Sequence, residues 1–398
     1  MKLEYSRINY ILTGLFFLIF PSNAYFIFGN IGKVFCLIFG SSIIFLSLFK
    51  FVYLGDKKTL KILIGGFLFL LIFIYISYAQ DQYTFTPLII TFSIVNYFLF
   101  ISGFLINKFE INEFKINNKL MFLFSLLTII SCYYFYNSFT FIGVNSIRGF
   151  GFENLNAIGV AYSNTQLALI FLFLLQRKNN LFMKLMLILS LVCTIIIVLI
   201  TESRGPFIFL ILTVLIIYYK SIFDLIFNLK KLFFFLILIL SIFYFVQNTS
   251  LISNKLNSFN NRLISLFSVF TSNQFDDTSS LERIEIQLDF FANYHKMFLG
   301  KYQYKPYPHN QFIEIFMRWG VFGIPILIIS LKSIINAIRF KRNHDSNILS
   351  LKSLVMILFI YCYLQSFTSL SLDNNRILWL GFGMFMYNYT KQPPKSLN

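Results

Sequence analysis

The sequence predicts an all-α, polytopic integral membrane protein with about twelve transmembrane helices. Of its 398 residues, 57% are hydrophobic and only 12% are charged, which is more apolar surface than a water-soluble core could bury. Apolar runs of about 17 to 25 residues, the length needed to cross about 30 Å of hydrocarbon, recur along nearly the whole chain. Backbone groups in lipid must be hydrogen-bonded internally, and these runs lack the alternation of barrel strands, so the spans are expected to be helices.

The apolar runs follow one another with short connections, apart from a single long one. We predict spans at residues 8–28, 33–53, 60–78, 85–106, 120–138, 156–175, 182–200, 206–220, 232–247, 309–331, 350–367 and 377–390. The long connection, residues 248–308, is expected to be an extracytoplasmic loop with short amphipathic helices. Its apolar residues recur there at helical spacing, for instance at Leu281, Ile284, Leu288 and Phe291. Residues 1–398 are expected to form a single membrane domain.

The basic excess of the chain predicts its orientation. The formal net charge is +17, and most of the 33 Lys and Arg residues fall in alternate connections, on the side that would also hold both termini. Cytoplasmic loops carry such an excess of Lys and Arg, so both termini are expected to be cytoplasmic. This placement makes anionic membrane lipid the expected partner of the charge and argues against nucleic acid.

A group of ionisable residues is predicted on the opposite, extracytoplasmic side: Arg148, Arg204, Arg283 and His309. An ionisable residue close to hydrocarbon costs free energy, which makes such a group a candidate functional site. Arg204 belongs to the turn Thr201-Glu202-Ser203-Arg204-Gly205-Pro206 between two predicted spans, where Gly205 and Pro206 end the helix. Its guanidinium could grip an anionic group through paired N–H donors.

Four short motifs follow one another on this predicted side. They are the stretch from Arg148 to Asn156, the Ser203-Arg204-Gly205 turn, the amphipathic segment around Arg283, and the His309-Asn310 pair with Gly320 and Gly323 downstream. In order, spacing and sidedness these motifs resemble the O-antigen ligase and polymerase family, multi-span glycosyltransferases of the GT-C type. The resemblance covers residues 145–325.

The resemblance implies an enzyme of the bacterial inner membrane whose active site is on the periplasmic face. It implies a glycan donor linked to undecaprenyl pyrophosphate, a glycan acceptor, and catalysis without a metal ion or other cofactor. Membrane lipids are expected partners, and a chain-length regulator is a further candidate. Its catalytic candidates in this sequence are Arg204, Arg283 and His309, and its substrate-binding candidates are Arg148, Asn156, Glu202 and Asn310. Arg376, in the last extracytoplasmic turn, is a further candidate for the acceptor side.

Transfer from a lipid pyrophosphate needs two kinds of assistance. The departing pyrophosphate needs charge stabilisation, which Arg204 and Arg283 can supply because arginine stays protonated at any working pH. The attacking hydroxyl must lose a proton, which His309 can accept because an imidazole with a pKa near ~6.5 can be neutral at physiological pH. A single displacement at the anomeric carbon would invert its configuration.

Each of these residues also has a plainer interpretation. Arg204 could be a snorkelling interface arginine, Arg283 a solvated helix residue, and Arg148 a structural residue. The His309-Asn310 pair could simply cap a helix. Arg318 follows Glu314 by four positions, so an intrahelical ion pair is its expected role.

Two activities within the family differ in their acceptor: lipid A core for a ligase, and a second lipid-linked repeat unit for a polymerase. The Tyr307-Pro308-His309-Asn310 form of the motif and the modest loop favour the polymerase, and glycosylation of protein Ser or Thr is a third possibility. The alternative from another class is a flippase for lipid-linked oligosaccharide. A transporter would be expected to place ionisable residues near the bilayer midplane and to show related halves, which this sequence does not.

Overall fold

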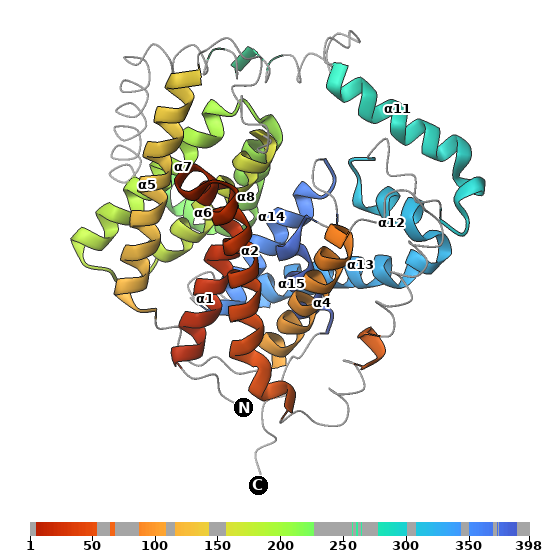
Figure 1. Ribbon diagram of the computed structural model, residues 1–398, viewed down its shortest axis with the longest axis horizontal. Helices are drawn as coiled ribbons and strands as arrows, with labels where there is room; N and C mark the ends of the chain where they lie inside the picture. Colours follow the sequence, from red (N-terminus) through yellow and green to blue (C-terminus); the bar gives the residue numbers. More distant parts are fainter. Residues whose placement is uncertain are drawn as a thin grey trace.

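The computed structural model describes residues 5–53, 64–67, 87–108, 116–142, 157–226, 257, 260–261, 264, 278–300, 308–343, 350–368, 372 and 374–387. Within these ranges every regular element is a helix. Five of the described helical segments are long and apolar enough to cross a membrane, and several shorter helices are also apolar. The chain is therefore an α-helical membrane protein (Figure 1). Most of the predicted span at 60–78 and all of that at 232–247 lie outside the described residues.

The first two helices form an antiparallel hairpin: α1 (Tyr5–Ile19) and α2 (Pro21–Tyr53). The reversal of the chain lies inside α2, at Gly29, whose φ of 65° interrupts the helix. Small residues let the two arms approach closely, since a Cβ on Gly14 would lie 2.8 Å from the carbonyl oxygen of Gly40. At the far end of the hairpin, Arg7 Nη1 donates to the Ser47 carbonyl over 3.4 Å. This reversal falls between the spans predicted at 8–28 and 33–53.

Among the described helices, a very close crossing joins segments that are far apart in the sequence, α4 (Pro87–Lys108) and α15 (Arg376–Phe385). A Cβ on Gly103 would collide with the Leu380 carbonyl, and a Cβ on Gly383 would collide with the Phe100 carbonyl. Glycine at both positions brings the two backbones into direct contact, as is common between helices in membranes.

Five further helices pack against one another: α5 (Asn118–Ile142), α6 (Ala157–Leu175), α7 (Leu181–Ile200), α8 (Arg204–Ile226) and α14 (Leu351–Gln365). The α6 helix is largely buried and packs against α1, α2, α7, α8 and α14. Asn164 of α6 and Asn23 of α2 exchange amide hydrogen bonds of 3.0 and 3.1 Å, and Asn23 also donates to Ser131 of α5. Because unpaired polar groups are costly in lipid, this reciprocal pair fixes the register of the three helices.

The predicted span at 309–331 falls in a candidate membrane-spanning segment, Gln311–Arg342, but this segment is not one regular helix. The structure divides this part of the chain at Gly320 into α12 (Gln311–Trp319), the short 3-10 helix η2 (Gly320–Gly323) and α13 (Ile324–Asn343). Gly320 has a φ of 53°, and a Cβ there would collide with the Phe298 carbonyl. That same carbonyl accepts a hydrogen bond of 3.0 Å from the Val321 amide. The segment that contains Phe298, earlier in the chain, therefore packs into the break between α12 and α13.

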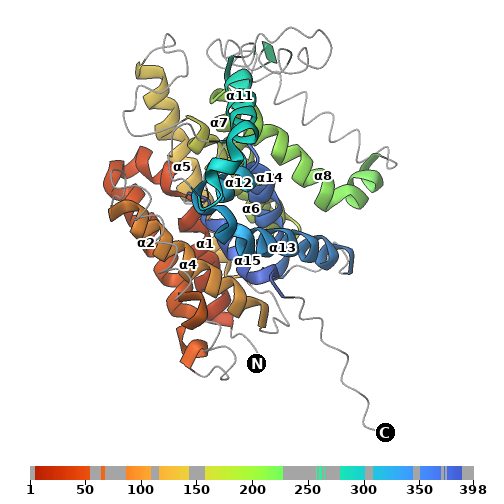
Figure 2. The same ribbon diagram turned by 90° about the vertical axis from the view of Figure 1, so that its right-hand side faces the viewer.

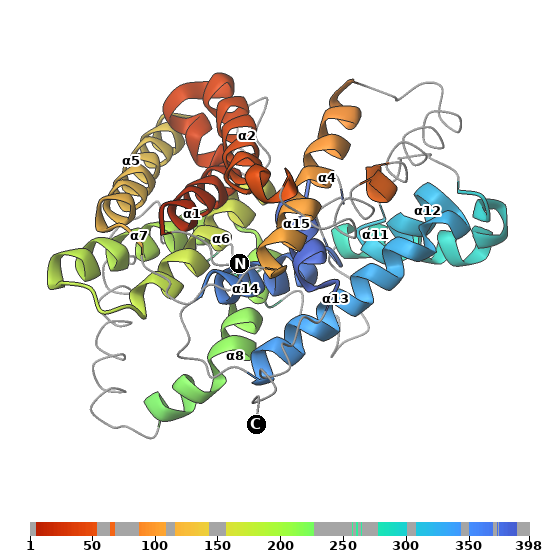
Figure 3. The ribbon, with the colours of Figure 1, turned by 90° about the horizontal axis from the view of Figure 1, so that it is seen from below.

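The segment that fills the break follows α11 (Thr278–Asn293) and the short 3-10 helix η1 (Tyr294–Met297). In two perpendicular views α11 lies above α12 (Figures 1 and 2). In the third view α13 runs diagonally away from α12 (Figure 3). The helix predicted around Leu281 to Phe291 is thus present. Its apolar face is exposed, with Leu288 and Phe291 each 62% accessible.

Candidate functional site

His309 lies two residues before the first residue of α12, in a conformation that its surroundings must hold. Its φ is 51°, in the left-handed region that residues other than glycine rarely adopt. Its Nδ1 atom lies 3.1 Å from the backbone carbonyl oxygen of Thr368, just past the end of α14. A carbonyl oxygen only accepts hydrogen bonds, so the neutral ring that makes this bond carries its hydrogen on Nδ1. The lone pair is then on Nε2, the atom that can take a proton.

The surroundings of His309 keep the imidazole neutral. Burial lowers the pKa of His309, and the positive charge of Arg283 on α11 lowers it further, while the hydrogen bond to Thr368 raises it. The balance takes the pKa from 6.5 to about 4. At physiological pH the ring is therefore uncharged, with a cation from α11 beside it. Arg283, a solvated residue in the plainer interpretation, is partly buried and lies close enough to act on His309.

The turn that carries Arg204 lies close to Thr368, the residue that contacts His309. Thr201 ends α7, Glu202 has a φ of 53°, and Arg204 is the first residue of α8. Pro206 fits the first helical turn, where a missing amide hydrogen is tolerated. A Cβ placed on Gly205 would lie 3.8 Å from Oγ1 of Thr368, the residue whose carbonyl contacts His309. The structure thus brings the Arg204 turn, Arg283 and His309 together around the end of α14.

The structure places the substrate-binding candidates in different environments. Asn310 caps α12, its Oδ1 accepting hydrogen bonds from the amides of Phe312 (2.9 Å) and Ile313 (3.4 Å), as the capping alternative predicts. Glu202 is buried, with 7% of its surface exposed. Arg376 is the first residue of α15 and lies near Lys33 of α2, whose positive charge it opposes. Arg148 and Asn156 lie outside the described residues.

Two features of this region have no counterpart among the predicted site residues. Thr368 contributes a backbone carbonyl, which leaves no signal in the side-chain pattern. Glu314 forms the predicted ion pair with Arg318, Oε1 to Nη2 at 2.6 Å, but both side chains are buried and the carboxylate also contacts a distant backbone amide. In the described part of the chain, no group of three or more His, Cys, Asp or Glu side chains is arranged to hold a metal ion.

Comparison with models of known protein families gives no match, and comparison with curated proteins gives none either. The chemistry of the site therefore rests on its own residues: a neutral imidazole with an oriented proton acceptor, a guanidinium beside it, and a second arginine at the neighbouring turn.

Proposed function

We propose that this chain is an O-antigen or related surface-polysaccharide polymerase. It would join repeat units carried on undecaprenyl pyrophosphate at the periplasmic face of the bacterial inner membrane. The observation that carries the proposal is the position of His309, whose Nδ1 is held by the Thr368 carbonyl and whose ring lies beside Arg283. The proposal also rests on the resemblance of the motifs that contain these residues.

In the proposed reaction, a hydroxyl oxygen of the acceptor glycan attacks the anomeric carbon of the donor glycan. The bond from that carbon to the pyrophosphate oxygen breaks, and its electron pair leaves with the lipid pyrophosphate. Nε2 of His309 accepts the hydroxyl proton, and attack from the face opposite the leaving group inverts the anomeric configuration. Arg283 and Arg204 stabilise the charge that develops on the pyrophosphate. Because guanidinium groups carry permanent charge, the proposed step uses no metal ion.

The proposed orientation places about twelve spans across the membrane with both termini in the cytoplasm. Basic residues at the opposite helix ends support it. Arg177 Nη1 donates to the Ile116 carbonyl over 3.2 Å, and Lys352 Nζ donates to the Asn107 carbonyl over 2.7 Å. Arg177 lies just after the end of α6 and Lys352 in the first turn of α14, two helix ends that the positive-inside rule would assign to the cytoplasm.

The test is the ladder of surface glycan from cells in which the native gene is deleted and then restored as wild type or as His309→Ala. A polymerase that depends on His309 predicts that the deletion and His309→Ala both lose every rung above a single repeat unit on core. Wild type should restore the full ladder. A full ladder from His309→Ala would contradict the proposed role of the imidazole.

The same gel separates the alternatives. A ligase would lose every rung including the first, with polymer accumulating on the lipid carrier, because it attaches finished glycan to lipid A core. A transporter would also lose every rung, with single repeat units accumulating on the cytoplasmic side of the membrane.

A further inference from the structure

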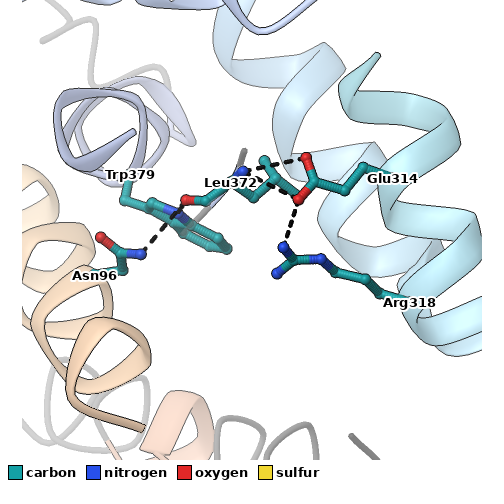
Figure 4. A network of polar contacts seen from close by, with 5 residues as sticks. All are labelled: Asn96, Glu314, Arg318, Leu372 and Trp379. Carbon is teal, nitrogen blue, oxygen red and sulfur yellow. Dashed lines mark hydrogen bonds and ion pairs between the residues drawn. The ribbon is translucent and has the colours of Figure 1, made fainter. Parts of the chain in front are cut away.

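A buried carboxylate on α12 binds the connection between α14 and α15. Both oxygens of Glu314 accept from the backbone amide of Leu372, over 3.2 and 3.1 Å (Figure 4). Arg318, one turn further along α12, holds Oε1 of the same carboxylate at 2.6 Å. The side chains of Glu314 and Arg318 are 2% and 5% exposed, so this ion pair is largely shielded from solvent.

The peptide group at Leu372 is held from its other side as well. Its carbonyl oxygen accepts from Nε1 of Trp379 on α15 at 2.8 Å and from Nδ2 of Asn96 on α4 at 3.5 Å. Figure 4 shows Glu314 approaching Leu372 from one direction and Trp379 with Asn96 approaching from the other. One backbone position therefore joins α12, α15 and α4, helices that are distant in the sequence.

The same connection contacts the start of α12 at two further points. The Gln311 amide donates to the Ser366 carbonyl over 3.0 Å, and His309 contacts the Thr368 carbonyl over 3.1 Å. Thr368 thus lies between two positions, Ser366 and Leu372, that α12 itself fixes. The only one of these attachments made by an ionised side chain is that of Glu314.

We propose that Glu314 is a positioning residue: by fixing Leu372 it holds the Thr368 carbonyl where it orients the imidazole of His309. The carboxylate that binds the Leu372 amide is also paired with Arg318, and breaking a buried ion pair leaves an uncompensated charge. The contact between Glu314 and Leu372 therefore resists displacement more strongly than a neutral hydrogen bond would. Arg318 pairs with the carboxylate and fixes its direction. The catalytic part of this inference rests on the proposed function, but the orientation of His309 does not.

The orientation can be measured without any substrate. In a protein carrying His295→Gln and His344→Gln, His309 is the only histidine, because the chain has three. The rate at which diethyl pyrocarbonate modifies this ring reports how firmly it is held and covered. We expect Glu314→Gln to raise that rate several-fold, since a neutral amide cannot replace both carboxylate contacts with Leu372. Glu314→Asp should react at an intermediate rate, because it keeps the charge.

The matched control is Asp289→Asn, which also exchanges a carboxylate for an amide. Asp289 is exposed on α11, where it accepts from Asn293 of the same helix. It should leave the reactivity of His309 unchanged. An unchanged rate in folded Glu314→Gln would overturn the inference, and so would an equal increase in the control.

Trp379→Phe provides a second variant if Glu314→Gln does not fold. It removes only the indole N–H that binds the Leu372 carbonyl and keeps a large aromatic ring in place. We expect a smaller increase in the reactivity of His309 in this variant. A rate equal to that of the parent protein would show that the contacts at Leu372 do not set the orientation of His309, which would overturn the inference.

Kinetics in reconstituted vesicles then separate positioning from binding. For Glu314→Gln we expect kcat to fall by up to about 100-fold, because small misplacements of a reacting group have effects of this size. The KM for the lipid-linked donor should stay unchanged. An increase in His309 reactivity without any loss of kcat would uphold the positioning and contradict the proposed role of His309. A fall in kcat with unchanged reactivity would overturn the positioning.

Discussion

The crossing of α4 and α15 and the meeting of α12 with the end of α14 are held together in opposite ways. The crossing depends on absent side chains, since Gly103 and Gly383 bring the two helix backbones into contact. At the other contact, polar groups reach across from one element to the next, as His309 does to Thr368 and Glu314 does to Leu372. The first arrangement gives stability through close packing, whereas the second fixes the direction of particular atoms. Substitutions should therefore have different consequences in the two regions.

The largest effect is expected from the arginines at the polar contact. Arg204→Ala and Arg283→Ala should each lower polymer formation by about 100-fold or more, because each removes a charge that stabilises the departing pyrophosphate. Thermal unfolding in detergent should change little, since both residues are partly exposed. The control is Arg339→Ala, an exposed arginine on α13. Near-normal polymer from Arg283→Ala would return that residue to a solvated role.

At the crossing, Gly383→Ala should affect the folded structure instead of the chemistry. The added Cβ would collide with the Phe100 carbonyl, and relief of such overpacking costs about 3 kcal/mol of the free energy of unfolding. Reversible unfolding in mixed micelles would measure this loss. Gly159→Ala is the control, because a Cβ there meets no atom within 4 Å. Equal stability of the two variants would show that the crossing is looser than the structure indicates.

The acidity of His309 tests how closely Arg283 approaches it. In the single-histidine protein, nitrogen NMR of labelled imidazole should give a pKa of about 4 and a hydrogen on Nδ1. Arg283→Gln removes a positive charge that opposes protonation, so the pKa should rise toward 6.5. Because the neutral ring is the proposed base, the active fraction at mildly acidic pH should fall in this variant. An unchanged pKa would show that Arg283 on α11 does not act on His309.

The smallest effect is expected at Asn310. Asn310→Ala removes the cap of α12 and should lower the free energy of unfolding by about 1 kcal/mol. Asn310→Asp keeps an oxygen acceptor for the Phe312 and Ile313 amides, so its stability should match wild type. If Asn310→Asp were fully stable but inactive, Asn310 would have the substrate-binding role that its motif suggests in addition to capping.

Local patterns in the sequence were sufficient for much of the fold. The helices α5, α6 and α7 begin and end within a few residues of the runs predicted at 120–138, 156–175 and 182–200, apart from a longer end to α5. Each is defined by its own apolar length, which a sequence displays directly. The turn between α7 and α8 was likewise expected from Gly205 and Pro206.

Contacts between distant segments were not predictable in this way. The break at Gly320 depends on the Phe298 carbonyl, and the orientation of His309 depends on the Thr368 carbonyl. Backbone groups are the same at every residue, so no pattern of side chains predicts the contacts that these carbonyls make. The pair of Glu314 and Arg318 was visible from its spacing, but its contact with Leu372 was not, because it joins positions 58 residues apart.

The most direct test of the central claim uses purified protein in vesicles supplied with a repeat unit linked to undecaprenyl pyrophosphate. The proposed polymerase activity predicts that wild type forms new glycosidic bonds of inverted configuration and releases the lipid pyrophosphate. His309→Ala should bind the same donor and form no polymer. Movement of the lipid-linked unit across the bilayer without any new glycosidic bond, or polymer formation by His309→Ala at the wild-type rate, would contradict it.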